Sequence, residues 1–297
     1  MFSSVVQPPL VSLFSSTGSS PLHLWETHTD QSLPADSFIV LLNDATALPT
    51  PAAPKSLIAL PPLSDPSSSD AHDDTGYALA QTVLHIQSPS LPTTYIRCPP
   101  RSSSSSSSNT RMSRGLELKH PWLHLQVRNL GREWSFEVGV VDQSGKEGVV
   151  RFSTFQKEPA LHVTTAPPLL HLPLAFPHAS TRPLTTWCTL PVHLPTLLPF
   201  FSSHALIRTR SSERDDGSAD ENDTEDLPPE AAGRVPRPGP HFSHVSYVKV
   251  YATCRLRRIW FSESRMGDTQ GTAGAQIQKT PWEFQMYAAE KVSVDSN

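Results

Sequence analysis

The chain has 297 residues, of which 37% are hydrophobic, which supports a core smaller than the full length would suggest. Its 30 prolines are about twice the ordinary share of roughly 5%, while its 13 glycines are few, so we expect one domain, residues 1–297, with irregular stretches inserted between its strands. No run approaches the roughly 18 uninterrupted apolar residues that span a membrane, and the first residues lack the basic segment of a signal peptide. Composition therefore argues against a membrane or secreted protein.

The formal net charge of −4 conceals an uneven distribution of charge. The segment Ser211–Asp226 holds eight acidic residues and one arginine, so the rest of the chain is net positive. We expect this acidic segment to be disordered, because it offers little apolar surface to bury. It is either an inert linker or a tethered competitor for basic residues that follow it.

Alternation of apolar and polar residues predicts extended strands along much of the chain. In chain order, the expected strands are Leu79–Ile86, Thr93–Cys98, Leu123–Val127, Trp134–Val140, Val149–Phe155, Thr186–Val192 and Val248–Ser262. The connection "DQSGK" before Val149 contains a glycine and predicts a hairpin turn. Because the strands have one apolar face and helical periodicity is nearly absent, we predict an all-β fold, an antiparallel β-sandwich of jelly-roll type.

The predicted core follows from the same alternation. We expect it to contain Leu123, Leu125, Val127, Trp134, Phe136, Val138, Val250 and Leu256. Between the strands, four stretches rich in Pro, Ser or acidic residues predict long disordered inserted loops. They lie at about residues 29–75, 99–112, 158–183 and 195–240.

The run "VKVYATCRLRRIWFS", from Val248 to Ser262, is apolar and strongly basic at once. Read as one strand, it turns its alternate apolar residues to the core and its polar residues outward. The parity changes after Arg257, which predicts a β-bulge with Arg258 as the extra residue. The outer face would then carry Lys249, Arg255, Arg257, Arg258 and Trp260. This face is either a docking patch, since Arg and Trp are enriched at binding hot spots, or a merely solvated face.

Catalytic and metal-binding motifs are not apparent in the sequence. The 13 histidines are scattered, and the one H-x-x-H pair, His241 and His244, would face opposite sides of a strand. The three cysteines, Cys98, Cys188 and Cys254, have no CxxC pairing, and each lies in a strand-like run. We expect no catalytic, cofactor or metal site, and we expect the cysteines to be buried free thiols.

The strand segments together resemble the cilia- and flagella-associated protein 20 domain family. The most specific segment is "CRLRRIWFS", and "TTYIRCPP" and the segment around Trp25 add to the resemblance. The matching runs, in the family's order, are Pro9–Glu26, Thr93–Pro100, Leu118–Asp142, Arg151–Gln156, Cys188–Leu194 and Tyr247–Ser264. Together these runs make up a little over a quarter of the chain.

The resemblance implies a jelly-roll β-sandwich without known catalytic activity, located at the axoneme and basal body of cilia and flagella. Similar family members touch tubulin and neighbouring inner-junction proteins of doublet microtubules and influence ciliary motility. One departure stands out, because "PTLLPFFSSHALIRTRSS" replaces a tryptophan-containing strand of the family after "CTLPVHL". Either Leu206 and Ile207 supply a degenerate replacement for this strand, or the chain is a divergent member of the family.

Two functions compete at this stage. A structural microtubule-associated protein suits the resemblance, and an acidic tubulin surface would attract the arginines. A nucleic-acid-binding module of the nucleus or cytoplasm is the alternative, because β-sheets can pair basic and aromatic side chains on one face. An enzyme that uses the cysteines has no motif in its favour.

Overall fold

The computed structural model describes residues 6–49, 81–101, 115–176, 187–207, 235–267, 278–279, 281 and 284. The acidic segment Ser211–Asp226 and the serine run Ser102–Ser108 fall among the residues outside these ranges. The hypothesis about the acidic segment is therefore left as a hypothesis.

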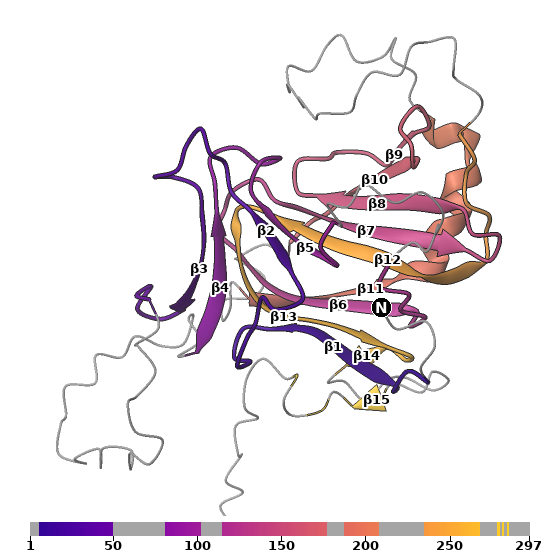
Figure 1. Ribbon diagram of the computed structural model, residues 1–297. Coiled ribbons are helices and arrows are strands. Elements are labelled where there is room, and N and C mark those ends of the chain that lie inside the picture. The colour runs from indigo at the N-terminus through magenta and orange to yellow at the C-terminus, as the bar shows by residue number, and fades with distance from the viewer. Residues whose placement is uncertain are drawn as a thin grey trace, which may run out of the picture.

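The described strands form two large sheets that pack face to face, with a short two-stranded pair beside them (Figure 1). Sheet A has the spatial order β11 (Trp187–His193), β6 (Trp122–Asn129), β13 (Cys254–Ser262), β4 (Thr82–Gln87) and β3 (Phe38–Asn43), and β1 (Leu10–Ser15) pairs with β13. Sheet B has the order β2 (Glu26–His28), β5 (Tyr95–Cys98), β12 (Phe242–Tyr251), β7 (Ser135–Asp142), β8 (Glu147–Ser153), β10 (Leu169–Pro173) and β9 (Ala160–His162). The third, short pair consists of β14 (Met266–Gly267) and β15 (Gln278–Lys279).

This architecture confirms the predicted β-sandwich. The pairs within both large sheets are antiparallel except β8 with β10, which run parallel. The hairpin predicted at "DQSGK" joins β7 and β8, and Gly145 has φ +80° there, a conformation that favours glycine.

The core lies between the two sheets, where the inward residues of both meet. All eight residues predicted for it are fully buried: Leu123, Leu125, Val127, Trp134, Phe136, Val138, Val250 and Leu256. The Trp134 indole N–H donates to the main-chain oxygen of Tyr251 at 3.1 Å, which satisfies its polar atom inside the apolar layer.

Three of the four stretches expected as disordered insertions contain regular structure, and to that extent the expectation is wrong. Stretch 29–75 contains β3, whose residues Phe38–Asn43 pair along their full length with β4. Stretch 158–183 contains β9 and β10. Short apolar runs form these strands, and the surrounding polar and proline-rich residues hide them in an averaged composition.

The stretch 195–240 begins with 3-10 helix η1 (Leu194–Ser202), which stands where the family's tryptophan strand was expected. Leu194, Leu198 and Phe201 recur every three to four residues and are fully buried, so one side of η1 joins the core. A second short 3-10 helix, η2 (His204–Leu206), follows, and Ile207 forms an isolated bridge with Leu161. Leu206 and Ile207 pack against the core without forming a strand.

Candidate partner-binding faces

The run from Val248 to Ser262 is two strands rather than one. β12 ends at Tyr251 in sheet B, and β13 begins at Cys254 in sheet A, so the chain crosses the sandwich at Ala252 and Thr253. Lys249 therefore lies on one sheet, and Arg255, Arg257, Arg258 and Trp260 lie on the other. The prediction that all five residues share one face is wrong.

The predicted bulge exists, one position earlier than expected. Leu256 pairs with Val127 and Arg258 pairs with Gln126, so Arg257 is the extra residue on β13. The change of parity lets both Leu256 and Ile259 face the core. The sequence thus predicted the irregularity, and the pairing with β6 fixes its position.

The arginine-rich strand is not a freely solvated face. Arg257 is 6% exposed and Trp260 is 1% exposed. The Arg257 guanidinium donates to the side-chain oxygens of Gln81 and Gln126, at 3.0 and 3.1 Å. Trp260 stacks on His124 of β6, with ring centroids 4.9 Å apart and an interplanar angle of 6°. The expectation that Arg257 and Trp260 point into solvent is therefore wrong, because neighbouring side chains cover both.

Asp44 lies directly after β3, and its buried carboxylate contacts side chains from three other strands of sheet A. Arg128 of β6 lies 3.0 Å from Asp44 Oδ1, and Arg255 of β13 lies 2.6 Å from the same oxygen. The Trp187 indole N–H of β11 donates to Oδ2 at 2.8 Å. Nothing in the sequence connects Asp44 to these partners, because they are distant along the chain.

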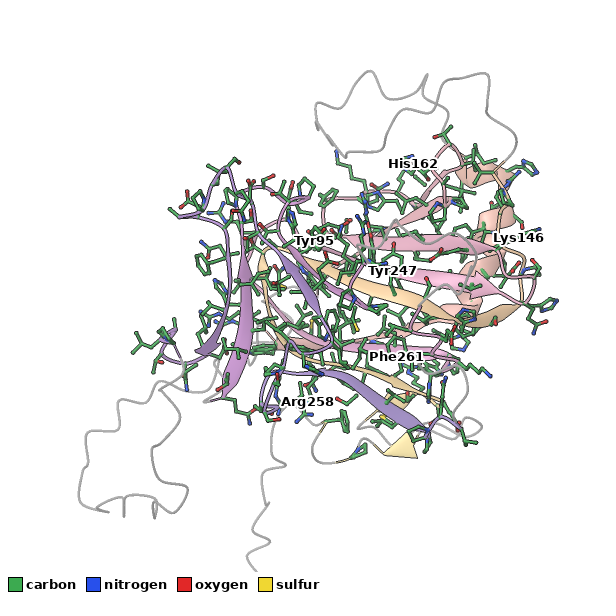
Figure 2. The ribbon with its side chains drawn as sticks, in the orientation of Figure 1. Tyr95, Lys146, His162, Tyr247, Arg258 and Phe261 are labelled. Atoms are coloured by element: carbon green, nitrogen blue, oxygen red, sulfur yellow. The ribbon has the colours of Figure 1, made fainter. Side chains whose placement is uncertain are left out.

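Four arginines thus gather on the outer side of sheet A, including Arg128, which the sequence analysis missed. We call this surface the sheet A face and define it by Arg128, Arg255, Arg257, Arg258, Gln126, His124 and Trp260. Figure 2 places Arg258 at the outer side of the sheet and Phe261 toward the opposite sheet. Aromatic rings continue across the face, since Trp122 lies 4.5 Å from His193 and 6.4 Å from His124 between ring centroids.

The outer side of sheet B carries a second row of charges, to which Lys249 belongs. In register across adjacent strands, Arg97 pairs with Lys249, Lys249 with Glu137, and Glu137 with Arg151. Arg151 Nη2 lies 2.7 Å from Glu137 Oε1, and the Tyr251 hydroxyl donates to the same oxygen at 2.8 Å. We call this row, together with Tyr95, Tyr247 and Tyr251, the sheet B face; Figure 2 labels two of its tyrosines.

Aromatic rings surround the cations of the sheet B face. The Lys249 ammonium lies 3.8 Å from the Tyr95 ring centroid and 4.2 Å from that of Tyr251, and the Arg97 guanidinium lies 4.6 Å from the Tyr247 centroid. Burial lowers the pKa of Lys249 to about 8, against the attraction of Glu137. Burial alone would raise the pKa of Glu137, but the charges of Arg151 and Lys249 outweigh it and lower that pKa.

The cysteines and the His241–His244 pair, considered above as candidate reactive or metal-binding residues, do not form a site in the described part of the chain. Cys98 and Cys254 are buried, and burial raises the pKa of the Cys98 thiol to about 12, which keeps it protonated; Cys188 is only half-buried. His241 precedes β12 and is exposed, whereas His244 lies within the strand. Within the ranges that the structure covers, no group of three or more His, Cys, Asp or Glu side chains is placed to hold a metal ion, and no helix is long and apolar enough to cross a membrane.

The strands and their outer faces define a two-layer β-sandwich protein with charged and aromatic surfaces. Comparison with known proteins adds a similarity to one protein family. Residues 69–198 match the family model of the CFA20 domain. The chain is also 22% identical over 263 residues to cilia- and flagella-associated protein 20 of Chlamydomonas reinhardtii, a match that covers 89% of each chain. The resemblance to the cilia- and flagella-associated protein 20 domain family is thereby confirmed.

Proposed function

We propose that this chain is a non-enzymatic structural protein of the ciliary or flagellar axoneme and basal body. In this proposal it docks on tubulin and on inner-junction proteins of the doublet microtubule and supports ciliary motility. The observation that carries the proposal is the match to the CFA20 domain together with the cilia- and flagella-associated relative, whose alignment covers 89% of this chain.

The sheet A face supports microtubule docking by its chemistry. It collects four arginines, of which Arg128 and Arg255 share the Asp44 carboxylate. A surface with this density of guanidinium groups attracts an acidic protein surface such as that of tubulin and orients the encounter. Arg258 is the best probe of this attraction, because it is half-buried rather than fully enclosed and does not belong to the Asp44 ion pairs.

Microtubule co-sedimentation of the full chain tests the proposal. We expect binding that weakens as salt is raised, and a roughly 2- to 5-fold weaker affinity for Arg258→Ser, the range for one exposed ion pair. Arg132→Ser is the matched control, because Arg132 is exposed in the turn between β6 and β7, outside the strands that carry the sheet A face. Equal pelleting of wild type and Arg258→Ser would remove the sheet A face from the proposal.

Replacing Arg255 as well would confuse this experiment. Arg255 forms a buried ion pair with Asp44, so its loss leaves part of that carboxylate's charge uncompensated. A variant that binds weakly because it is partly unfolded says nothing about the surface. The single replacement at Arg258 avoids this ambiguity.

Nucleic-acid binding is the second candidate function, favoured by the aromatic rings beside the arginines. Trp122 and His193 are half-buried, and their rings lie close enough to offer a stacking surface. Filter binding with single-stranded oligonucleotides, on the same protein sample used for co-sedimentation, separates the two functions. Retention of oligonucleotide without microtubule pelleting would favour the second.

A further inference from the structure

Residues near the end of the chain return to the sheet A face. After β13, Met266 and Gly267 of β14 pair in parallel with Gln278 and Lys279 of β15, at the lower edge of the molecule in Figure 1. Phe284 then lies against Trp260 and Met266 and is only 5% exposed. An aromatic side chain from a distant segment therefore occupies part of the face that carries Arg258 and Trp260.

Three residues of β6 and β13 hold Phe284, each by a different contact. The Trp260 ring lies 5.2 Å from the Phe284 ring between centroids, at an interplanar angle of 50°. The Arg258 guanidinium lies 5.2 Å from the centroid of the Phe284 ring. The Gln126 side-chain amide donates to the main-chain oxygen of Phe284 at 2.6 Å. These contacts recognise a phenyl ring and a backbone carbonyl, features that any peptide with a phenylalanine presents.

The site also holds a hydrogen-bond donor that the Phe284 contact does not use. The Trp260 indole nitrogen is buried and has no hydrogen-bond partner among the residues that the structure describes. Buried polar groups in proteins are almost always paired. The carbonyl of a second peptide residue beside the phenylalanine would satisfy this donor, which makes the site suited to a peptide and not only to a phenyl ring.

We propose that Trp260, Arg258 and Gln126 form a binding site for a partner protein's peptide in which an acidic residue precedes a phenylalanine, and that Phe284 occupies this site within the chain. The charge of Arg258 favours an acidic residue next to the phenylalanine, and in this chain Glu283 precedes Phe284. Because Phe284 belongs to the same chain as the site, its effective concentration at the site is on the order of millimolar. A partner's peptide must therefore displace it.

Fluorescence anisotropy with a labelled peptide of sequence KTPWEFQMY, residues 279–287, tests this inference on the full-length chain. Phe284→Ala removes the internal competitor, so we expect this variant to bind the peptide at least about 10-fold more tightly than wild type does. The same peptide with alanine in place of phenylalanine should not bind. In the Phe284→Ala background, Arg258→Ser should weaken binding and Arg132→Ser should not.

Two outcomes overturn the inference: a folded Phe284→Ala chain that does not bind the peptide, or equal binding of the phenylalanine and alanine peptides. Should Phe284→Ala not fold, Phe284→Leu replaces it, because leucine fills more of the space than alanine does and has no aromatic ring. The same expectations and the same overturning results then apply. The assay contains no microtubules. Its failure therefore leaves the proposed ciliary function intact, and the loss of microtubule binding would likewise leave this inference intact.

Discussion

Arg255 lies 2.6 Å from the carboxylate of Asp44, a residue 211 positions earlier in the chain, and also donates to the Asp44 main-chain oxygen at 2.8 Å. Arg128 shares the same carboxylate. The side chain of Asp44 is fully buried, so two guanidinium groups depend on one enclosed negative charge. Such a pair is strongly destabilised when one partner is removed.

We therefore expect Asp44→Ala to lower the free energy of unfolding by about 3–5 kcal/mol, because it leaves Arg128 and Arg255 largely enclosed without their counter-charge. Urea denaturation followed by tryptophan fluorescence measures this loss. Asp36→Ala, at an exposed turn residue, is the control and should stay within about 0.5 kcal/mol of wild type. A loss below about 1 kcal/mol for Asp44→Ala would contradict the role given to this carboxylate.

The strands of the central core could be predicted from the sequence because their alternation reports directly on burial. Phe136 and Val138 face the core in the expected parity. At β12 and β13 the same alternation led to a wrong prediction, that of one continuous strand. Val250, Cys254 and Leu256 all face one interior although they lie on two sheets, so the alternation continues unbroken across the crossing. Periodicity reports which side of a strand is buried, but not which sheet the strand joins.

The candidate faces were harder to predict than the core, since they depend on contacts between distant residues. Arg128 looked like an ordinary polar position of a strand, and only the pairing of β6 with β13 sets it opposite Arg255. Trp260 looked exposed by parity, and its burial comes from contacts with Phe284, Met266 and His124, none of which its own strand contains. Alternation along one strand contains no information about what covers that strand from outside.

Acid should destabilise the fold through His124. Burial lowers the pKa of His124 from its ordinary 6.5 to about 4. Between pH 6.5 and 4, the unfolded chain therefore binds a proton that the folded chain does not, and stability falls as the pH falls, by at most about 1.4 kcal/mol per pH unit from this group. Burial also lowers the pKa of His85, which acts in the same direction.

His124→Phe isolates this contribution, because phenylalanine keeps a ring against Trp260 but cannot be protonated. Urea denaturation of both proteins between pH 7 and 4.5 should show wild type losing stability relative to the variant as the pH falls. Other groups also titrate between pH 7 and 4.5. Their contribution is the same in both proteins, so it cancels when the free energies of unfolding of wild type and variant are subtracted. Parallel stability curves would show that His124 is not held neutral by the fold.

Mild alkali should have the opposite effect through Lys249. Its pKa of about 8 in the folded chain lies below the ordinary 10.5, so between pH 8 and 10 the unfolded chain keeps a proton that the folded chain has released. Stability should therefore rise with pH in this window, by at most about 1.4 kcal/mol per unit. Lys249→Met keeps an unbranched side chain between Tyr95 and Tyr251, but that side chain has no proton to gain or lose.

The measurement is the free energy of unfolding of wild type and Lys249→Met at pH 8, 9 and 10. Wild type should gain stability relative to the variant across these values. The window ends at pH 10 because burial raises the pKa of Tyr251 well above its ordinary value, and that shift lowers stability at higher pH. A constant difference between the two proteins would rule out a lowered pKa for Lys249.

Close packing of β7 against β12 predicts that Gly139 cannot be replaced without loss of stability. Gly139 pairs with Tyr247, and a Cβ atom at Gly139 would lie 2.5 Å and 2.6 Å from two carbons of the Tyr247 ring, as well as against the Ser246 hydroxyl. The ring is held by the Tyr247 hydroxyl's hydrogen bond to Glu137, at 3.3 Å, and by the Arg97 guanidinium above it. Moving the ring to make room would weaken both contacts.

We expect Gly139→Ala to lower the free energy of unfolding by about 1–3 kcal/mol, the usual range for an overpacked interior. Gly18→Ala is the control, because a Cβ atom there meets only the Ser15 carbonyl oxygen, at 3.3 Å, in an exposed turn. A double-mutant cycle with Tyr247→Ala assigns the cause, since removing the ring should reduce the effect of the alanine at position 139. If Gly139→Ala lowers stability equally with and without the Tyr247 ring, the clash with that ring is not what keeps this position a glycine.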